Sequence, residues 1–372
     1  MLYEKLKEYT ASGVYPMHMP GHKRNAEFMP ALLLHEVDIT EIHGFDDLHD
    51  PRGILRETAE LAATLYGSKK AFLLVNGSTV GILAAIGAHT ERGDKILVAG
   101  NCHQSVNNAV SLFGLEVILL LPETNKDSGV SCSIDPAEIE SALDKDPQIK
   151  LVVITSPSYE GVVSDIKSIA EASNRRAIPL LVDSAHGAHL GFSPGFPDSA
   201  VSAGADVVVM SLHKTLPAMT QCSLLHVNGK HAATDEIARL LSVLQTSSPS
   251  YVLMASIDHC LRMLASEKNR LFRDYERNLK SFSDMVMSLK KLFVLDKTRN
   301  GFFAYDLGKI VIVTKNTALS GFELADILRS SYKIEIERAS VEYAIAMTSV
   351  CDKTEGFERL AAALREIDRS QF

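Results

Sequence analysis

The sequence lacks tryptophan, has few cysteines, and shows no arrangement of residues typical of a disulfide framework or a metal site. Its five cysteines are an odd number, widely scattered, and form no CxxC pair. His18 and His22 stand four residues apart, but Pro20 and Gly21 break the helix that a metal-binding pair at this spacing needs, and no HExxH motif is present. We therefore expect unpaired thiols and no metal.

Long apolar runs, basic clusters and a secretory signal are also missing. No apolar stretch approaches the ~18 residues of a membrane-spanning helix, and residues 1–8 contain acids and lack the apolar core of a signal peptide. The chain has 38 Lys and Arg against 46 Asp and Glu, a formal net charge of −8, and no basic run. Nucleic acids and anionic membranes are bound through basic patches, so we expect a cytoplasmic protein with neither partner.

The sequence does contain short apolar runs, rich in β-branched residues, that alternate with longer segments of helical pattern. The 372 residues are 46% hydrophobic, which excludes a disordered chain and allows roughly two or three domains. Runs that are apolar on both faces and separated by helices are typical of a mainly parallel sheet covered by helices. The predicted strands span 71–75, 95–98, 115–120, 150–155, 178–182, 206–210 and 223–227. We therefore predict an α/β large domain over residues 46–250, preceded by an N-terminal arm over 1–45.

The pattern changes near residue 250. Residues 252–291 carry apolar side chains at helical spacing, which predicts linking helices over 251–292. The remainder, 293–372, predicts a smaller α+β domain. Its expected elements are a strand over 309–314, a helix over 320–331, strands over 333–337 and 343–348, and a helix from residue 354.

Polar residues directly follow several predicted strands, where an open α/β sheet binds its ligands. The segment Asn76-Gly77-Ser78-Thr79 opens a helix, so it is either a phosphate cradle or a simple helix cap. Asp183 ends a buried strand, where a carboxylate needs a cationic partner such as a protonated ring nitrogen, unless it caps the next helix.

Lys214 follows the strand over 206–210, where desolvation would free its amine as a nucleophile for imine chemistry. Taken singly, it would be a surface lysine. Ser211 and His213 could add donors to a phosphate. His103 could stack on a ring, cap a helix or belong to the core. Phosphate, ring nitrogen and Schiff-base lysine are the three anchors of pyridoxal phosphate, so together these residues predict that cofactor.

Seven segments of the sequence resemble, in order, the signature blocks of the bacterial Orn/Lys/Arg decarboxylases. This family consists of pyridoxal-phosphate enzymes with the aspartate-aminotransferase-like fold, a fold type I or PLP-dependent transferase-like architecture. The resemblance covers about the first 260 residues and, more loosely, the smaller domain over 293–372. The segments are Met19-Pro20-Gly21-His22-Lys23, Asp46-Asp47-Leu48-His49, Asn76-Gly77-Ser78-Thr79, Asn101-Cys102-His103, Thr155-Ser156-Pro157-Ser158-Tyr159-Glu160-Gly161, Asp183-Ser184-Ala185-His186-Gly187-Ala188-His189 and Ser211-Leu212-His213-Lys214-Thr215.

The resemblance implies a role for each candidate residue. Lys214 would form the covalent link to the cofactor, Asp183 would pair with the ring nitrogen, and Lys214 or His213 would protonate the substrate carbon. His103 would stack on the ring and His186 would lie near its phenolic oxygen. The phosphate would be held by Ser78, Thr79, Ser211 and His213. The segment 245–251 resembles one that reaches a neighbouring subunit's site, which implies a homodimer or a higher homo-oligomer with shared sites.

The implied activity is decarboxylation of lysine, arginine or ornithine to a diamine or agmatine. Another pyridoxal-phosphate reaction, such as aminotransfer or aldol cleavage, or a cofactor-binding protein with little catalysis, stays open because fold does not fix reaction. Arg338 is either a carboxylate clamp for aminotransfer or a surface residue. The acidic group Asp38, Glu41, Asp46, Asp47 and Asp50 either reads a basic substrate or faces solvent.

The sequence departs from the family pattern in three places. Ser184 stands where members often have Glu, and His43 stands where they often have Pro. Members usually continue into a further C-terminal domain, whereas this sequence ends at Phe372, so we expect a short form.

Overall fold

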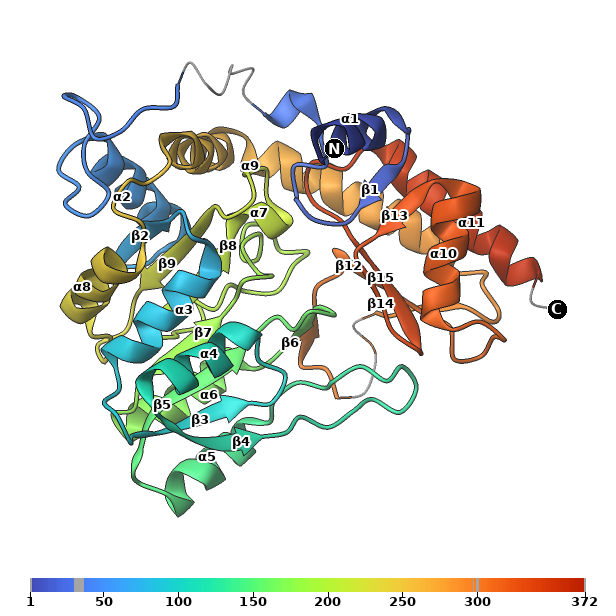
Figure 1. Ribbon diagram of the computed structural model, residues 1–372. Coiled ribbons are helices and arrows are strands. Elements are labelled where there is room, and N and C mark those ends of the chain that lie inside the picture. The colour runs from blue at the N-terminus through green and yellow to red at the C-terminus, as the bar shows by residue number, and fades with distance from the viewer. Residues whose placement is uncertain (1, 30–36, 297, 299–300, 371–372) are drawn as a thin grey trace.

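A seven-stranded sheet dominates the computed structural model, which describes residues 2–29, 37–296, 298 and 301–370 (Figure 1). The strand order is β2-β9-β8-β7-β5-β3-β4, and β9 runs antiparallel to β2 and β8 while the other neighbours are parallel. The expectation of an α/β fold with a mainly parallel sheet is therefore confirmed. The strands are β2 (Lys70–Leu74), β3 (Lys95–Ala99), β4 (Glu116–Leu120), β5 (Ile149–Thr155), β7 (Leu180–Asp183), β8 (Val207–Ser211) and β9 (Ser223–Val227).

Helices cover both faces of this sheet because its central strands are apolar on both sides. Val208 and Met210 of β8 belong to one buried cluster, whereas Val207 and Val209 belong to another. The second cluster includes buried residues of α3 (Gly77–Ala88), α4 (Gln104–Phe113) and α8 (Thr234–Leu244). The first includes residues of α2 (Ile54–Tyr66), α5 (Pro136–Lys145), α6 (Ile166–Arg175) and α9 (Tyr251–Val286).

The helical region after residue 250 is one helix, not several. α9 runs for 36 residues, and its sequence contains neither Pro nor Gly to interrupt it. Ser250 caps its first turn by accepting the Leu253 N–H. The helix packs on α2 at the large sheet and on α11 (Thr354–Ser370) beyond it, so it connects the two parts of the molecule (Figure 1).

A second, antiparallel sheet follows α9, with the order β10-β12-β15-β14. These strands are β10 (Phe293–Val294), β12 (Lys309–Val313), β15 (Tyr343–Met347) and β14 (Arg338–Ala339), and α10 (Gly321–Tyr332) joins them with α11 to form the small lobe. The strand expected over 333–337 belongs elsewhere. It forms β13 (Ile334–Ile336), which pairs in parallel with the N-terminal strand β1 (Tyr15–Met17).

The N-terminal residues lie against the small lobe. Figure 1 shows α1 (Leu2–Ala11) and β1 beside β13 and α11, away from the large sheet; a short 3-10 turn, η1 (Ala26–Phe28), follows β1. The short strand β6 (Val162–Val163) pairs with β11 (Ala304–Tyr305). Because β6 follows β5 and β11 precedes β12, this pairing connects the large sheet with the small lobe. Among the described residues, no helix combines the length and the apolar character needed to cross a membrane.

Candidate functional site

A cavity of about 280 Å³ lies where β7 and β8 end and α3 begins. Most of the residues singled out from the sequence line it together, although they come from separate segments of the chain. They are Ser78, Thr79, His103, Asp183, Ser211, His213 and Lys214. His186 adjoins this group through Lys214, so the structure brings all of these candidates to one place.

One end of the cavity gathers hydroxyl groups at the start of α3. The Ser78 hydroxyl lies 2.7 Å from the Ser211 hydroxyl and donates to the Ser223 hydroxyl over 3.2 Å. Asn76 precedes α3 without capping it through its side chain, and Gly77 takes a left-handed φ of 75° that glycine tolerates best. A helix start of this kind, surrounded by hydroxyls, attracts an anion. Ser223 was not singled out from the sequence because it opens a strand, β9, instead of following one.

Asp183 places a carboxylate at the buried end of β7. Its side chain is only 3% exposed, and Oδ1 accepts the Ala185 N–H over 3.1 Å. Burial raises the pKa of Asp183, whereas the charges of Lys214 and His103 and the Ala185 hydrogen bond act in the opposite direction. The site therefore holds a carboxylate whose ionisation depends on the positive charge around it.

Lys214 lies in the one-turn helix α7 (Leu212–Thr215), directly after β8. Its Nζ lies 3.1 Å from His186 Nε2. Burial lowers the pKa of Lys214, and the carboxylates of Asp183 and Glu337 oppose this effect. A lysine with a lowered pKa releases its proton more easily, which is the condition for its amine to act as a nucleophile.

Two histidines flank the cavity. His103 is both a capping residue and a cavity residue, since its Nδ1 accepts the Ser105 N–H at the start of α4 while the ring lines the cavity. His213 Nδ1 lies 3.0 Å from the Cys222 carbonyl oxygen, which can only accept, so Nδ1 carries the proton of the neutral ring. Burial lowers the pKa of His213 and favours this neutral form.

The loop after β5, which belongs to the fifth signature segment, brings Tyr159 to the site, although no role was assigned to this side chain from the sequence. The Tyr159 ring packs on His186 with the ring centres 4.6 Å apart, and its hydroxyl donates to Glu337 Oε1. The exposed Arg338 guanidinium lies over the Tyr159 ring, 5.0 Å from its centre. Glu337 and Arg338 come from the small lobe, so their proximity to Tyr159 depends on how the lobes pack.

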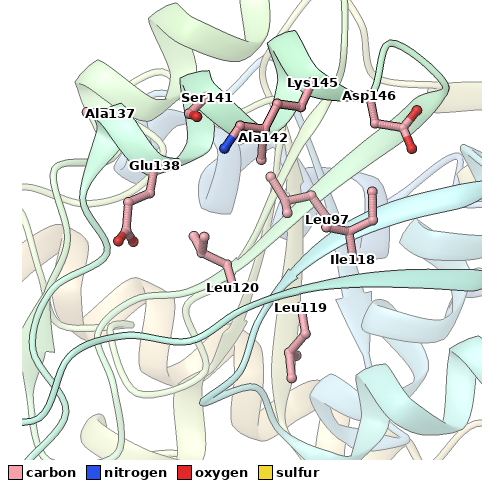
Figure 2. Close-up of a pocket in the computed structure, with 10 residues that line it drawn as sticks. All are labelled: Leu97, Ile118, Leu119, Leu120, Ala137, Glu138, Ser141, Ala142, Lys145 and Asp146. Atoms are coloured by element: carbon pink, nitrogen blue, oxygen red, sulfur yellow. The ribbon is translucent and has the colours of Figure 1, made fainter.

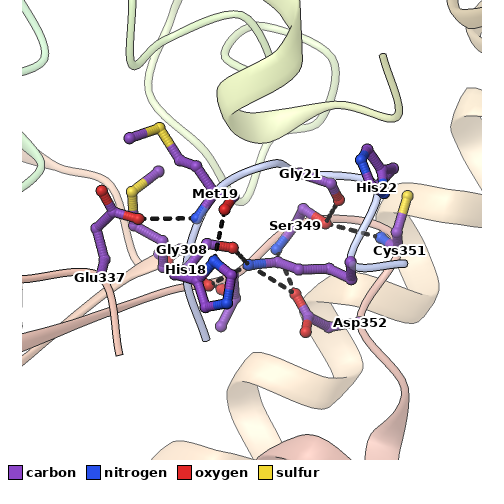
Figure 3. Close-up of polar contacts among 12 residues, drawn as sticks. His18, Met19, Gly21, His22, Gly308, Glu337, Ser349, Cys351 and Asp352 are labelled. Carbon is purple, nitrogen blue, oxygen red and sulfur yellow. Dashed lines mark hydrogen bonds and ion pairs between the residues drawn. The ribbon is translucent and has the colours of Figure 1, made fainter. Parts of the chain in front are cut away.

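The N-terminal segment 18–23 is fixed between α7 and the small lobe. Figure 3 shows its contacts with the small lobe, such as that between Gly21 and Ser349. The Gly21 N–H donates to the His213 carbonyl over 2.7 Å, and the Gly21 carbonyl accepts from the Ser349 hydroxyl. Lys23 is buried and donates to the carbonyls of His18 and Met347, with Asp352 at 3.9 Å. This gives the first signature segment a structural role at α7, the one-turn helix with Lys214 that we call the lysine turn.

The acidic residues of the N-terminal region lie outside the cavity lining in this chain. Asp46 accepts the N–H groups of Arg52, Gly53 and Leu55 and so fixes the start of α2. Asp50 pairs with Arg52 on the surface, and Asp38, Glu41 and Asp47 are exposed. Their expected role in reading a basic substrate stays a prediction.

A separate hollow of about 560 Å³ lies between α5, the edge strand β4 and its neighbour β3 (Figure 2). Its walls are mainly aliphatic, including Leu97, Ile118 and Leu120, and its Asp146 forms an ion pair with Lys95 over 2.8 Å. None of its lining residues belongs to the Lys214 cavity. The smaller cavity at the ends of β7 and β8, which carries the lysine, the aspartate and the histidines, is therefore the candidate active site.

We predict that Gly21→Ala lowers the free energy of unfolding by about 1–3 kcal/mol, because a Cβ there would lie 2.8 Å from the Leu216 backbone N and O atoms. Gly100→Ala is the control, since its Cβ would first meet the end of the Leu121 side chain, which is free to move. Chemical denaturation measures both variants. Equal stabilities would contradict the tight packing of the N-terminal segment on the lysine turn.

The comparisons with known proteins place the chain in a family. A family model described as the Orn/Lys/Arg decarboxylase major domain matches residues 1–303. The chain is 44% identical over 263 residues to the uncharacterized protein YaaO of Bacillus subtilis (strain 168), which covers 69% of this chain and 55% of that protein. It is 32% identical over 375 residues to the arginine decarboxylase of the same organism, covering 98% of this chain and 76% of the enzyme.

Among solved structures, the Francisella novicida lysine decarboxylase LdcF superposes with a TM-score of 0.79 at 19% identity, over 94% of this chain and 57% of that one. The chain thus spans little more than half the length of YaaO and of LdcF. The family match covers most of the sequence and confirms the resemblance drawn from the motifs. The chain belongs to the Orn/Lys/Arg decarboxylase family.

Proposed function

We propose that this protein is a pyridoxal-phosphate-dependent decarboxylase of a basic amino acid, with lysine, arginine or ornithine as substrate and a diamine or agmatine as product. The observation that carries the proposal is the convergence of Lys214, Asp183 and the hydroxyls at the start of α3 in one cavity. Family membership and the relatives named arginine and lysine decarboxylase support the same reaction class.

The donors in the cavity fit a phosphate group. Ser78, Thr79 and Ser211 offer hydroxyls, and the start of α3 carries no side-chain cap that would occupy its N–H groups. His213 would contribute through Nε2 only in its protonated form, because Nδ1 already donates to the Cys222 carbonyl. A bound dianion next to this ring would favour that protonation.

The opposite end of the cavity fits the reactive part of the cofactor. Asp183 would hold a proton on the ring nitrogen, and a cation there would in turn relieve the cost of burying its carboxylate. His103, on the open side, would cover a ring face, and His186 would stand beside the phenolic oxygen. When bound, pyridoxal phosphate supplies the electron-accepting ring that weakens the bonds to the α-carbon of an amino acid.

The protein's own contribution is to place charges and protons around that ring. Lys214 Nζ would hold the cofactor and return a proton to the product carbon, with His213 as the other candidate donor. Glu337 is the acidic residue of the small lobe whose charge acts on Lys214, so we propose it as a partner for the positively charged end of the substrate. Its two oxygens accept from Tyr159 and from the Met19 N–H, which fixes its orientation.

The cofactor assignment predicts that the purified protein, incubated with pyridoxal phosphate, gains a visible absorption band, and that borohydride reduction removes this band and leaves a stable pyridoxyl label on Lys214. Lys214→Ala should lose both the band and the label, because its side chain supplies the amine. Peptide mapping by mass spectrometry locates the label, and Lys280→Ala serves as the control for an exposed lysine. A label on another lysine, or an unchanged spectrum in Lys214→Ala, would overturn the assignment.

The reaction assignment predicts carbon dioxide release from at least one of lysine, arginine and ornithine. Asp183→Asn should slow this release roughly 100-fold or more, since removing one preorganised electrostatic group costs about 10²–10³ in rate. A panel of these three amino acids, with glutamate as a negative control, measures the activity. Keto-acid-dependent amino transfer without gas, or bound cofactor without turnover, would replace decarboxylation by one of the two alternative functions.

We also propose a homodimer in which the segment 245–251 approaches the neighbouring site. In this chain Gln245 accepts the Val75 N–H and the Thr246 N–H donates to Asn76, so the segment adjoins the start of α3, while residues 246–248 are exposed. Light scattering coupled to size exclusion should give twice the 40.6 kDa mass of the chain, or a higher even multiple. A monomer at micromolar concentration would contradict the shared site. The cytoplasmic location stays a prediction.

A further inference from the structure

A second lysine lies behind the Lys214 cavity. Lys309, at the start of β12, is only 1% exposed, and its Nζ lies 2.8 Å from His186 Nδ1. The other nitrogen of the same ring, Nε2, lies 3.1 Å from Lys214 Nζ. The imidazole of His186 therefore joins two lysine amines, one from each lobe.

Two pairs of residues with the same spacing hold this arrangement in place. His186 and His189 follow β7, whereas Asp306 and Lys309 precede and open β12. His189 Nε2 lies 3.0 Å from Asp306 Oδ1, which also accepts the Gly308 N–H. The two contacts between the pairs lie side by side and fix the start of β12 against the loop that carries His186.

Lys309 has little room to leave this position. A Cβ on Gly161, the glycine of the β5–β6 loop, would come within 2.7 Å of Lys309 Cγ, so only glycine leaves space for the lysine stem. Gly161 has a φ of 97°, which also favours glycine. The amine is thus directed at His186 by the packing of its own stem.

The hydrogen-bond capacity of the three groups limits how many protons they hold. An ammonium group can only donate, and a neutral imidazole has one donor nitrogen and one acceptor nitrogen. If both lysines were charged, both ring nitrogens would have to accept, which a neutral imidazole cannot do. Both contacts can be hydrogen bonds only when one of the two amines is neutral and accepts the N–H of His186.

We propose that Lys214 and Lys309 share one proton through His186, and that Lys309 is the positioning residue that takes up the proton when Lys214 becomes a free amine. In one state Lys214 is an ammonium that donates to Nε2, and the Nδ1–H of His186 donates to neutral Lys309. In the other, the proton of Lys214 has passed to Nε2 while the Nδ1 proton has passed to Lys309. The total charge and the number of protons are the same in both states.

The surroundings allow the shared proton to lie on either lysine. Burial lowers the pKa of Lys309 to about 7. The charges of Lys214 and Lys23 lower it further, whereas the carboxylates of Asp306 and Glu337 act in the opposite direction. Burial also lowers the pKa of His186, and Lys309, Lys214, His103 and His213 add to this, so the ring stays neutral. At the other end, Asp183 and Glu337 favour a charged Lys214. Each lysine therefore has acidic neighbours that stabilise its charged form.

This inference rests on the proposed function only in taking Lys214 as the reactive amine, and its test does not require turnover. The cofactor-free protein is labelled with acetic anhydride across a range of pH, and mass spectrometry gives the extent of modification of Lys214. Wild-type Lys214 should gain reactivity in two steps, because two coupled groups titrate as a pair. A single step at the ordinary pKa of lysine would overturn the proposal on the wild-type protein alone.

Two substitutions of Lys309 separate proton sharing from a structural role. Lys309→Met removes the alternative site for the proton, so the pKa of Lys214 should rise by about one unit, and labelling near pH 7 should fall roughly tenfold. Lys309→Arg can only donate, so it should hold His186 with its proton on Nε2 and increase the labelling of Lys214. Lys280→Met, on the exposed face of α9, is the control.

Opposite changes in the Met and Arg variants support the relay, whereas equal changes, or none, would overturn it. Thermal unfolding checks that each variant is folded, and if neither folds, the wild-type profile decides. The outcome is independent of the decarboxylation assay. A chain with another pyridoxal-phosphate activity would still show the shared proton, and an active decarboxylase could lack it.

Discussion

The burial of ionisable groups at the ends of β7 and β8 is the constraint on which the rest of the site depends. Asp183 and His186 are buried and Lys214 is half-buried, so each is stabilised by a partner of suitable charge or hydrogen-bond capacity. The parallel sheet makes this possible because successive strands bring their carboxyl ends to one edge. The same burial lowers the pKa of Lys214 and favours its nucleophilic form.

The small lobe and the N-terminal segment take part in this environment and do not merely cover it. Lys309 and Glu337 reach the large-sheet loops from the small lobe, while Gly21 packs on the lysine turn and Lys23 connects that segment to Met347 and Asp352. A displacement between the lobes would change the hydrogen bonds of His186 and Tyr159 together. The electrostatics of the cavity therefore depend on how the two lobes pack.

The sequence was most informative where function and local structure share a position. All seven strands of the large sheet could be located, and the polar residues that follow them, such as Ser78, Asp183 and Lys214, meet in one cavity because strand ends converge. Lys309, Glu337 and Ser223 could not be assigned in this way, since their proximity depends on contacts between distant segments. A signal for Lys309 did exist: a lysine opens an otherwise apolar strand, three residues after an aspartate.

The central claim is that the Lys214 cavity holds pyridoxal phosphate with its phosphate at the start of α3 and its ring nitrogen at Asp183. A crystal structure of the protein grown with the cofactor tests this most directly. The account predicts density continuous with Lys214 Nζ, phosphate oxygens within hydrogen-bond distance of Ser78 and Ser211, and a ring nitrogen facing the Asp183 carboxylate. Cofactor density elsewhere, or a ring reversed so that its phosphate lies at Asp183, would contradict it.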